Sequence, residues 1–529
     1  MSLDAIIISS AGFSSLSDSS SMKLALGGKT ATIQLISTLL QGAELEGTNK
    51  NLKALNWHHV PKLNGITIFS YLSKKGFSCG LIDTLEDEID RFLQLLNEKP
   101  SYIILSTSFI YKKSMLIEAV NLIRRFAPDV TIVVGGPFVY SSYLLLQRKN
   151  DPAYDTISAE ADFLFLSNDQ KIKVDYYIIN LQGLEALTDL MTGRPAKRIS
   201  GLGYYDEKGL HITPPSSLEI YKRVAIEWKN LPNYIFLNKV MPVQASNGCP
   251  FKCRFCNFVK DPRATFIRQI DDIVNDLKSL QGLGVKYVRF VDDNFMLGKN
   301  DIEQICRRFI EEKIGIQWLT FMRASALSKA NLELLRKAGC REVQLGLESA
   351  HPSILREMNK QSDPQTYYRV IKSLLRNGID VSATFIIGFP GETEETAKAT
   401  IDFIKSIDFD EYEGNFVWWI FPFMLIPLCP IYDPKERIRY GLEGYWHTWR
   451  HNTMTYKQAH KIIKNAFFDI DKSSQGYSAD NLDMMQSLSP LKRKQFMLTR
   501  HKLSKVVQSK KLTDSQIVKV FRELFENEK

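Results

Sequence analysis

The chain has few cysteines and no basic leader. Only seven of its 529 residues are cysteine, and Cys79, Cys306, Cys340 and Cys429 are isolated from one another in the sequence. This scarcity argues against a disulfide framework and favours a reducing compartment, so we expect a cytoplasmic location. Met1–Ile8 has no basic region ahead of its apolar run, which argues against a signal peptide and predicts a first strand instead.

A long hydrophobic run is also missing. The run Phe416–Tyr432 is 17 residues long and contains Pro422, Pro427 and Pro430. A membrane-spanning helix needs about 20 apolar residues, and proline breaks a helix. The pattern therefore predicts a buried strand followed by a loop, and no membrane partner.

Charge of one sign gathers at the C-terminal end. The net charge is +9, and residues 490–529 hold eleven Lys or Arg against four Asp or Glu. The apolar spacing there predicts one or two amphipathic helices. Their basic face either binds an anionic partner, such as an acidic carrier protein or RNA, or is solvated, and we do not expect nucleic acid binding.

Three of the cysteines do cluster. Cys249, Cys253 and Cys256 are spaced as CxxxCxxC within one short segment. A four-iron cluster normally takes four thiolates, so three would leave one iron open for a substrate or cofactor. The alternative is a zinc loop, but zinc needs four ligands, and the nearest further candidates, Cys306 and His211, lie in no paired motif.

The N-terminal third alternates strands and helices. Residues 79–83, 102–106 and 130–134 are short apolar runs that predict parallel strands. Ligands of such sheets bind at the carboxyl ends of the strands. We therefore expect a ligand near Ser106 and Gly135.

A second series of strands follows the cysteines and ends in polar residues. The predicted strands are residues 287–295, 317–323, 342–349 and 381–393. Their ends carry Asp293, Arg323, Glu348 and a glycine-rich turn at Gly388. In a β/α barrel such ends surround the active site, so we expect all four to face one cavity.

The cysteine loop, with Gly248 before its first cysteine and Phe255 before its third, resembles the radical S-adenosylmethionine (radical SAM) superfamily. The resemblance implies that Cys249, Cys253 and Cys256 hold a [4Fe-4S] cluster whose open iron binds S-adenosylmethionine. It also implies cofactor contacts at Phe255, Asp293, Arg323, Glu348, Ser349 and Gly388. The structural alternatives are a helix N-cap for Asp292 and Asp293, a barrel salt bridge for Arg323, and an ion pair for Glu348.

The first domain resembles cobalamin-binding Rossmann domains. Ser106-Thr107-Ser108 is followed by 26 residues and then Gly135-Gly136, which is similar to the second half of their motif and implies contacts at Ser106, Thr107, Gly135 and Gly136. In the first half Gly65 is in register, but Lys62 stands where the lower-ligand histidine would be, and His58 and His59 are out of register. This departure is similar to cobalamin-dependent radical SAM enzymes that bind cobalamin without a protein imidazole.

The expected fold class is α/β, in four parts. An N-terminal Rossmann-like cobalamin-binding domain is expected over residues 1–150, a linker region over 151–235, a partial (β/α)6 radical SAM barrel over 236–435, and a mainly helical C-terminal domain over 436–529. The segment Tyr445–Met454 is dense in aromatic residues and histidine. It either caps the substrate cavity or packs a domain junction.

The resemblance implies a cobalamin-dependent radical SAM methyltransferase acting on an unactivated carbon, or phosphorus, of a small natural-product or peptide intermediate. The implied cofactors are a [4Fe-4S] cluster, S-adenosylmethionine and cobalamin, with a reductase or flavodoxin as electron donor. A non-methylating cobalamin enzyme that performs ring contraction or cyclisation is the first alternative. A non-catalytic cobalamin- or cluster-binding regulator is the second. The sequence identifies no catalytic residue.

Overall fold

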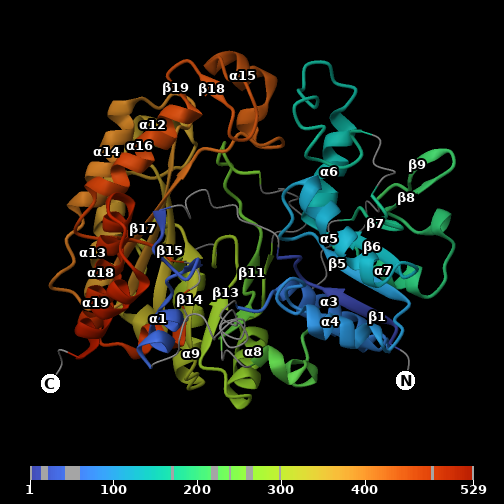
Figure 1. Cartoon of the computed structure of the whole chain (residues 1–529), viewed down its shortest axis with the longest axis horizontal. Helices are drawn as coiled ribbons and strands as arrows, with labels where there is room; N and C mark the ends of the chain where they lie inside the picture. Colours follow the sequence, from blue (N-terminus) through green and yellow to red (C-terminus); the bar gives the residue numbers. More distant parts are fainter. Residues whose placement is uncertain are drawn as a thin grey trace.

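The computed structural model describes residues 3–12, 22–41, 60–167, 172–180, 182–215, 224–236, 240–257, 266–296, 299–477, 480 and 482–526. Two seven-stranded sheets organise these residues, and Figure 1 shows them as two lobes lying side by side. One continuous hydrophobic core runs through both. His58 and His59 lie outside the described residues.

The first sheet has the order β4-β1-β5-β6-β7-β8-β9. The strands are β1 Ala5–Ile8, β4 Cys79–Ile82, β5 Tyr102–Ser106, β6 Thr131–Gly135, β7 Tyr176–Ile178, β8 Leu202–Asp206 and β9 Gly209–Ile212. The four residues of β1 are fully buried, as expected for a parallel strand covered on both faces. The covering helices are α3 Leu63–Lys74, α4 Ile89–Leu96, α5 Lys113–Phe126, α6 Pro137–Arg148 and α7 Leu184–Met191.

The first sheet extends beyond the predicted boundary of the first domain. Strands β7, β8 and β9 lie within the predicted linker of residues 151–235, and the last two run antiparallel at the sheet's edge. These strands are only three to five residues long, so the alternation of apolar and polar residues along each is too short to predict a strand from the sequence. Residues 176–212 therefore belong to the first lobe.

The second sheet is parallel throughout, in the order β10-β13-β14-β15-β16-β17-β20. Its strands are β10 Val240–Val243, β13 Tyr287–Phe290, β14 Gln317–Met322, β15 Cys340–Glu348, β16 Asp380–Ile387, β17 Phe416–Pro422 and β20 Ser474–Gln475. Its helices include α8 Ile270–Gly282, α9 Lys299–Glu311, α10 Ala324–Leu327, α11 Leu332–Lys337, α12 Pro352–Glu357, α13 Pro364–Arg376, α14 Glu394–Ser406, α15 Pro434–Tyr440 and α16 Tyr456–Asp469. The four predicted barrel strands and the strand at residue 416 are confirmed.

The C-terminal helices enclose a small core of their own. Helices α17 Leu482–Ser487, α18 Pro490–Ser509 and α19 Asp514–Glu526 pack around Phe496 and Phe521. Helix α1, Ile33–Leu40, joins them from the other end of the chain, and Figure 1 shows it, in blue, beside the red helices. Helix α1, which lies within the predicted domain of residues 1–150, therefore packs with the predicted domain of residues 436–529.

The predicted amphipathic helices at the C-terminal end are confirmed, but their basic face is only partly solvated. Arg493 pairs with Asp380 at 3.2 Å and Arg500 with Asp480 at 2.7 Å, and both arginines are buried. The Arg493–Asp380 pair holds α18 against β16 of the barrel, and the Arg500–Asp480 pair holds α18 against the segment before α17. The binding of an anionic partner stays a prediction for the remaining exposed lysines.

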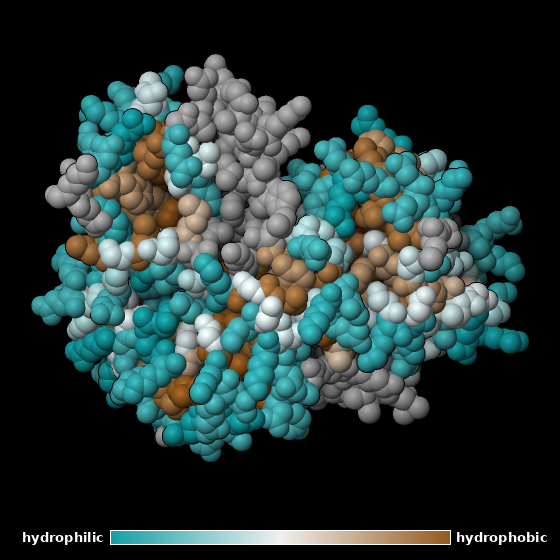
Figure 2. All heavy atoms as spheres, turned by 90° about the horizontal axis from the view of Figure 1, so that it is seen from below, coloured by the Kyte–Doolittle hydropathy of each residue, from teal (hydrophilic) through white to brown (hydrophobic). Residues whose placement is uncertain are grey.

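The remaining strands are two residues long and form antiparallel pairs: β2 Ala25–Leu26 with β3 Lys29–Thr30, β11 Ser246–Asn247 with β12 Phe266–Ile267, and β18 Arg450–His451 with β19 Met454–Thr455. Seen from below, hydrophilic side chains cover most of the surface, with hydrophobic patches among them (Figure 2). No helix of the described residues is both long and apolar enough to cross a membrane.

Candidate functional site

A cavity of about 1400 Å³ lies between the two lobes and continues into the barrel. Ser106, Thr107, Gly135 and Gly136 line it from the carboxyl ends of β5 and β6. Asp293 lines it from the segment after β13. The carboxyl ends of both sheets therefore meet at one space, as parallel sheets predict.

The three clustered cysteines follow β10 and β11 as a loop. Cys253 is buried, Cys249 and Cys256 are half-buried, and none of the three is in a disulfide with a described residue. Within the described part of the chain, no three Cys, His, Asp or Glu side chains already converge as a metal-binding group. The fit to a cluster therefore rests on the donor set, three thiols in one short loop beside the cavity.

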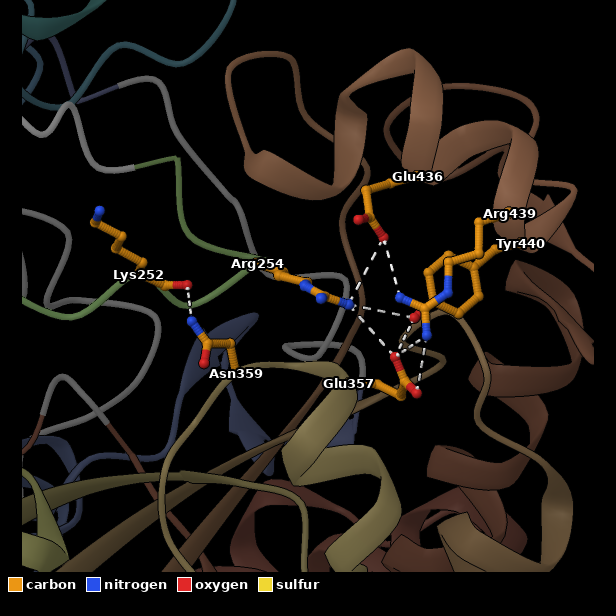
Figure 3. A network of polar contacts seen from close by, with 7 residues as sticks. All are labelled: Lys252, Arg254, Glu357, Asn359, Glu436, Arg439 and Tyr440. Atoms are coloured by element: carbon orange, nitrogen blue, oxygen red, sulfur yellow. Dashed lines mark hydrogen bonds and ion pairs between the residues drawn. The ribbon is translucent and has the colours of Figure 1, made fainter.

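A polar network fixes this loop to the barrel (Figure 3). Arg254 lies 3.4 Å from Glu357 and 3.6 Å from Glu436, so it links the loop to α12 and α15. Asn359 donates from its amide to the carbonyl of Lys252 at 2.8 Å. The network orients the backbone between the first and third cysteines without using a thiol.

The two carboxylates after β13 bind the chain just before the cysteines. Asp292 accepts hydrogen bonds from the backbone of Ala245 at 3.1 Å and from the hydroxyl of Ser246 at 2.6 Å. Asp293 accepts from the N–H of Gly248 at 2.9 Å and borders the cavity. Burial raises the pKa of Asp292 to about 7 and also raises the pKa of Asp293. Both carboxylates cap backbone N–H groups ahead of the cysteine loop rather than a helix.

Arg323 contacts the cysteine loop directly. Its Nη1 lies 3.4 Å from the sulfur of Cys253, and its guanidinium lies 3.8 Å from the centre of the Phe251 ring. Its Nη2 donates to the carbonyl of Lys360. Among the described residues no carboxylate pairs with it, so a barrel salt bridge is not what holds this buried arginine.

Glu348 lies at the end of β15, next to an irregularity in the sheet register. It has a φ of 69°, a left-handed conformation that is strained for glutamate and is typical of functional sites. Its carboxylate pairs with the buried Lys360 at 3.0 Å. Val343, Leu345 and Leu347 are buried in the core, and the carboxylate of Glu348 points toward Lys360.

Lys360 is a site residue that the sequence did not predict. It is twelve residues beyond Glu348, and its ammonium also lies 5.8 Å from the centre of the Phe255 ring, within the cysteine loop. Its position after α12 carries no motif. Arg323, Glu348 and Lys360 thus form a buried charged group beside the cysteines.

Ser349 and Gly388 have packing roles in the described structure. Ser349 is fully buried and its hydroxyl lies 3.3 Å from that of Thr400. Gly388 has a φ of 96°, and a Cβ there would lie 2.4 Å from the ring of Trp449. Arg323, Glu348, Ser349 and Gly388 are not part of the described cavity wall, so only Asp293 among the predicted strand ends reaches it.

The aromatic segment 445–454 divides between the two predicted roles. Trp449 and His451 are buried and stacked, and burial lowers the pKa of His451 to about 4, so His451 is neutral near pH 7. Trp446 instead lines the cavity, where Lys112 of the first lobe lies 4.8 Å from its ring. The segment packs a junction and contributes one ring to the cavity.

The end of the first sheet is shaped by small residues. Gly136 has a φ of 113°, and a Cβ there would lie 3.1 Å from the hydroxyl of Thr107. Asn64 donates to the hydroxyl of Ser106 at 2.7 Å. Lys62, where the motif would have histidine, pairs with Asp83 at 2.7 Å. In this wall of the cavity the close approach of Gly136 to Thr107 requires a residue without a Cβ.

Comparison with known families gives one match, to the radical SAM superfamily over residues 243–404. An uncharacterized methyltransferase, PH0819 of Pyrococcus horikoshii, is 29% identical over 56% of this chain and 64% of its own length. Bacteriochlorophyllide d C-12(1)-methyltransferase of Chlorobaculum tepidum is 30% identical over 40% of this chain and 46% of its own. The chain thus spans less than two thirds of the length of these curated relatives.

Among solved structures, the cobalamin-dependent S-adenosylmethionine radical enzyme OxsB with aqua-cobalamin bound is similar over 99% of this chain and 75% of its own, with a TM-score of 0.58. The sequence identity is 14%. This similarity concerns the fold, and it covers both lobes.

Proposed function

Because the chain carries a radical SAM domain over residues 243–404, we propose that it is a cobalamin-dependent radical SAM methyltransferase acting on a small natural-product or peptide intermediate. The observation that carries the proposal is the shared cavity. Ser106 and Gly136 form one wall and Asp293, beside the cysteine loop, forms another. Such a space would let one substrate meet two cofactors.

In this proposal Cys249, Cys253 and Cys256 hold a [4Fe-4S] cluster whose open iron binds S-adenosylmethionine. Together these cofactors supply one-electron chemistry, and cobalamin supplies a methyl carrier. Arg323 donates toward the sulfur of Cys253, which stabilises negative charge on that thiolate. Asp293 holds the backbone of Gly248, so it keeps the first cysteine in position.

Glu348 is proposed to bind S-adenosylmethionine at the barrel end. Among the described residues its carboxylate pairs with Lys360 alone, and so retains lone pairs for the hydroxyl or ammonium groups of a ligand. Phe255 contributes its backbone from the cysteine loop. Ser349 and Gly388 support this end through packing, in keeping with their burial beside Thr400 and Trp449.

Cobalamin is proposed to lie against Ser106, Thr107, Gly135 and Gly136. Their small side chains leave the backbone accessible. Lys62 stands where the motif would have histidine and pairs with Asp83, so we propose that this wall would hold cobalamin without a protein imidazole. A reductase or flavodoxin would supply electrons, and the free cysteines suit a reducing compartment such as the cytoplasm.

Anaerobic reconstitution tests the proposal. The protein is incubated with iron, sulfide, cobalamin, S-adenosylmethionine and a reductant, and both deoxyadenosine and S-adenosylhomocysteine are measured. Both products support methyl transfer with radical initiation. Deoxyadenosine alone supports a non-methylating enzyme, and neither product supports a regulator; either result contradicts the methyltransferase.

A further inference from the structure

The barrel interior is open and polar. Interiors of β/α barrels are usually filled by layers of bulky branched side chains. Here the inward positions of β13, β15 and β16 carry polar residues that line the cavity: Arg289, Glu342, Gln344, Asp380, Ser382 and Thr384. The positions between them, such as Val288, Val343 and Ala383, are buried in the surrounding core. The interior therefore has the character of a binding site rather than a packed core.

The charges inside the barrel are unevenly compensated. Asp380 accepts from Arg493 at 3.2 Å and from the backbone N–H of Asn415 at 2.8 Å. Arg289, in contrast, donates to the amide oxygen of Gln344 at 3.1 Å, and no carboxylate of a described residue lies within ion-pair distance of it. A guanidinium held inside a protein without a counter-charge favours binding of an anion.

Glu342 is the carboxylate that acts most on Arg289, but it does not fully neutralise the charge of the guanidinium. Burial lowers the pKa of Arg289, and Glu342 acts against that shift. Burial, reinforced by Asp380, raises the pKa of Glu342 to about 7. Burial thus favours the uncharged form of Glu342, and the described hydrogen-bond partner of Arg289 is the uncharged amide of Gln344.

Aromatic rings line the cavity beside these charges. The rings of Trp419 and Phe421 on β17 lie 6.1 Å apart with only 9° between their planes. The indole N–H of Trp419 donates to the hydroxyl of Ser382 at 2.9 Å, which fixes the ring. Phe421 keeps 36% of its surface exposed although it lines the cavity with Phe321. Lys23 and Gly476 already approach the ring of Trp419, so the open apolar surface is chiefly that of Phe421, and such surface is complementary to a planar ligand.

We propose that the barrel interior selects a substrate with a planar conjugated body, which lies against Trp419 and Phe421, and an anionic group, which binds Arg289. This inference rests on the proposed function, because it takes the shared cavity as the place where substrate enters. It adds the chemical class of that substrate. Gln344 holds the guanidinium of Arg289 in position.

A matched pair of probes tests the proposal. The probes are 2-naphthoate and 2-naphthamide, which have the same rings and similar size but differ in charge. Anaerobic titration calorimetry on the reconstituted holoenzyme should give at least about tenfold tighter binding of the naphthoate, as expected for one charge-assisted hydrogen bond. Arg289→Gln should abolish this preference and leave naphthamide binding unchanged, whereas Trp419→Leu should weaken binding of both probes.

Two further variants keep the test decisive. Arg289→Lys retains the charge and should preserve a preference for the naphthoate, even if Arg289→Gln folds poorly. Arg194→Gln removes an exposed arginine paired with Asp189 at 2.6 Å and should change neither affinity. Equal affinity for both probes in the unmodified protein, binding of neither probe, or a preference that survives Arg289→Gln would overturn the proposal.

Failure of the proposed function is visible separately. Cobalamin content and deoxyadenosine formation are measured on the same preparation and do not depend on either probe. If bound cobalamin and deoxyadenosine are absent while the charge-dependent preference for the naphthoate persists, the proposed function is wrong and the anion site is supported. If the products form and the preference is absent, only the substrate class is wrong.

Discussion

The carboxyl ends of the two sheets border one cavity but are built differently. At the end of the second sheet, charged side chains are held by protein groups: Asp292 by backbone N–H groups, Glu348 by Lys360. At the end of the first sheet, Gly136 lies so close to Thr107 that a Cβ would crowd its hydroxyl. The end of the second sheet positions charged side chains, and the end of the first sheet forms a wall of small residues. Removing charge should therefore damage the second sheet's site, and adding volume should damage the first.

The largest expected effect is at the cysteine loop. Changing Cys249, Cys253 or Cys256 to Ala leaves too few thiolates for a cluster, so iron content and deoxyadenosine formation should fall to background. Cys79→Ala is the matched control, because this half-buried cysteine lies in β4, in the other lobe. A Cys249/Cys253/Cys256 triple Ala variant that kept iron–sulfur absorbance would remove the basis of the assignment.

The next effect sharpens the role of shape at the first sheet. Gly136→Ala places a Cβ about 3.1 Å from the hydroxyl of Thr107, in a backbone conformation with φ of 113°. We expect loss of most cobalamin binding, measured by the absorbance of co-purified or added cobalamin. Gly193→Ala is the control, because Gly193 also has a positive φ, 79°, but has open space around it; it should lose about 1 kcal/mol of stability and bind cobalamin normally. Equal cobalamin binding by both variants would contradict the shape argument.

A smaller effect separates ligand binding from stability at the second sheet. Glu348→Gln and Lys360→Met each break the same buried ion pair, so each should lower stability by about 3–5 kcal/mol. Only Glu348→Gln removes the proposed ligand carboxylate, and it should weaken S-adenosylmethionine binding about tenfold more than Lys360→Met. Equal affinities for S-adenosylmethionine in calorimetry would mean that Glu348 is a structural ion-pair residue.

The smallest effect is a pH dependence in the turn after β16. Burial raises the pKa of Glu392 from 4.5 to about 8. Its contribution to stability is therefore complete below pH 4.5 and is lost as pH rises through about 8. Glu392→Gln stays neutral at every pH, so its Tm should be close to that of the wild type at pH 5 and clearly above it at pH 8.5. A difference in Tm that does not change with pH would contradict the buried, protonated carboxyl.

Local patterns predicted the parts of the molecule that depend on local periodicity. The strands at β5, β6, β13 and β15 follow from apolar runs, and the radical SAM resemblance is confirmed over residues 243–404. Lys360 could not be predicted, because only the turn after α12 brings it to Glu348. The docking of α1 on α19 and the short strands β7 to β9 depend on contacts between distant segments. The candidate site residues that lie in motifs could therefore be predicted from the sequence, and the residues that contact them in space could not.

We propose that the two unlike ends serve one cavity. Electron spin resonance of the reconstituted protein tests this most directly, by measuring the relaxation of the cob(II)alamin signal before and after reduction of the cluster. We expect faster relaxation once the cluster is reduced, and no such change in Cys253→Ala. Identical relaxation of the cob(II)alamin signal with and without a reduced cluster would contradict a shared cavity.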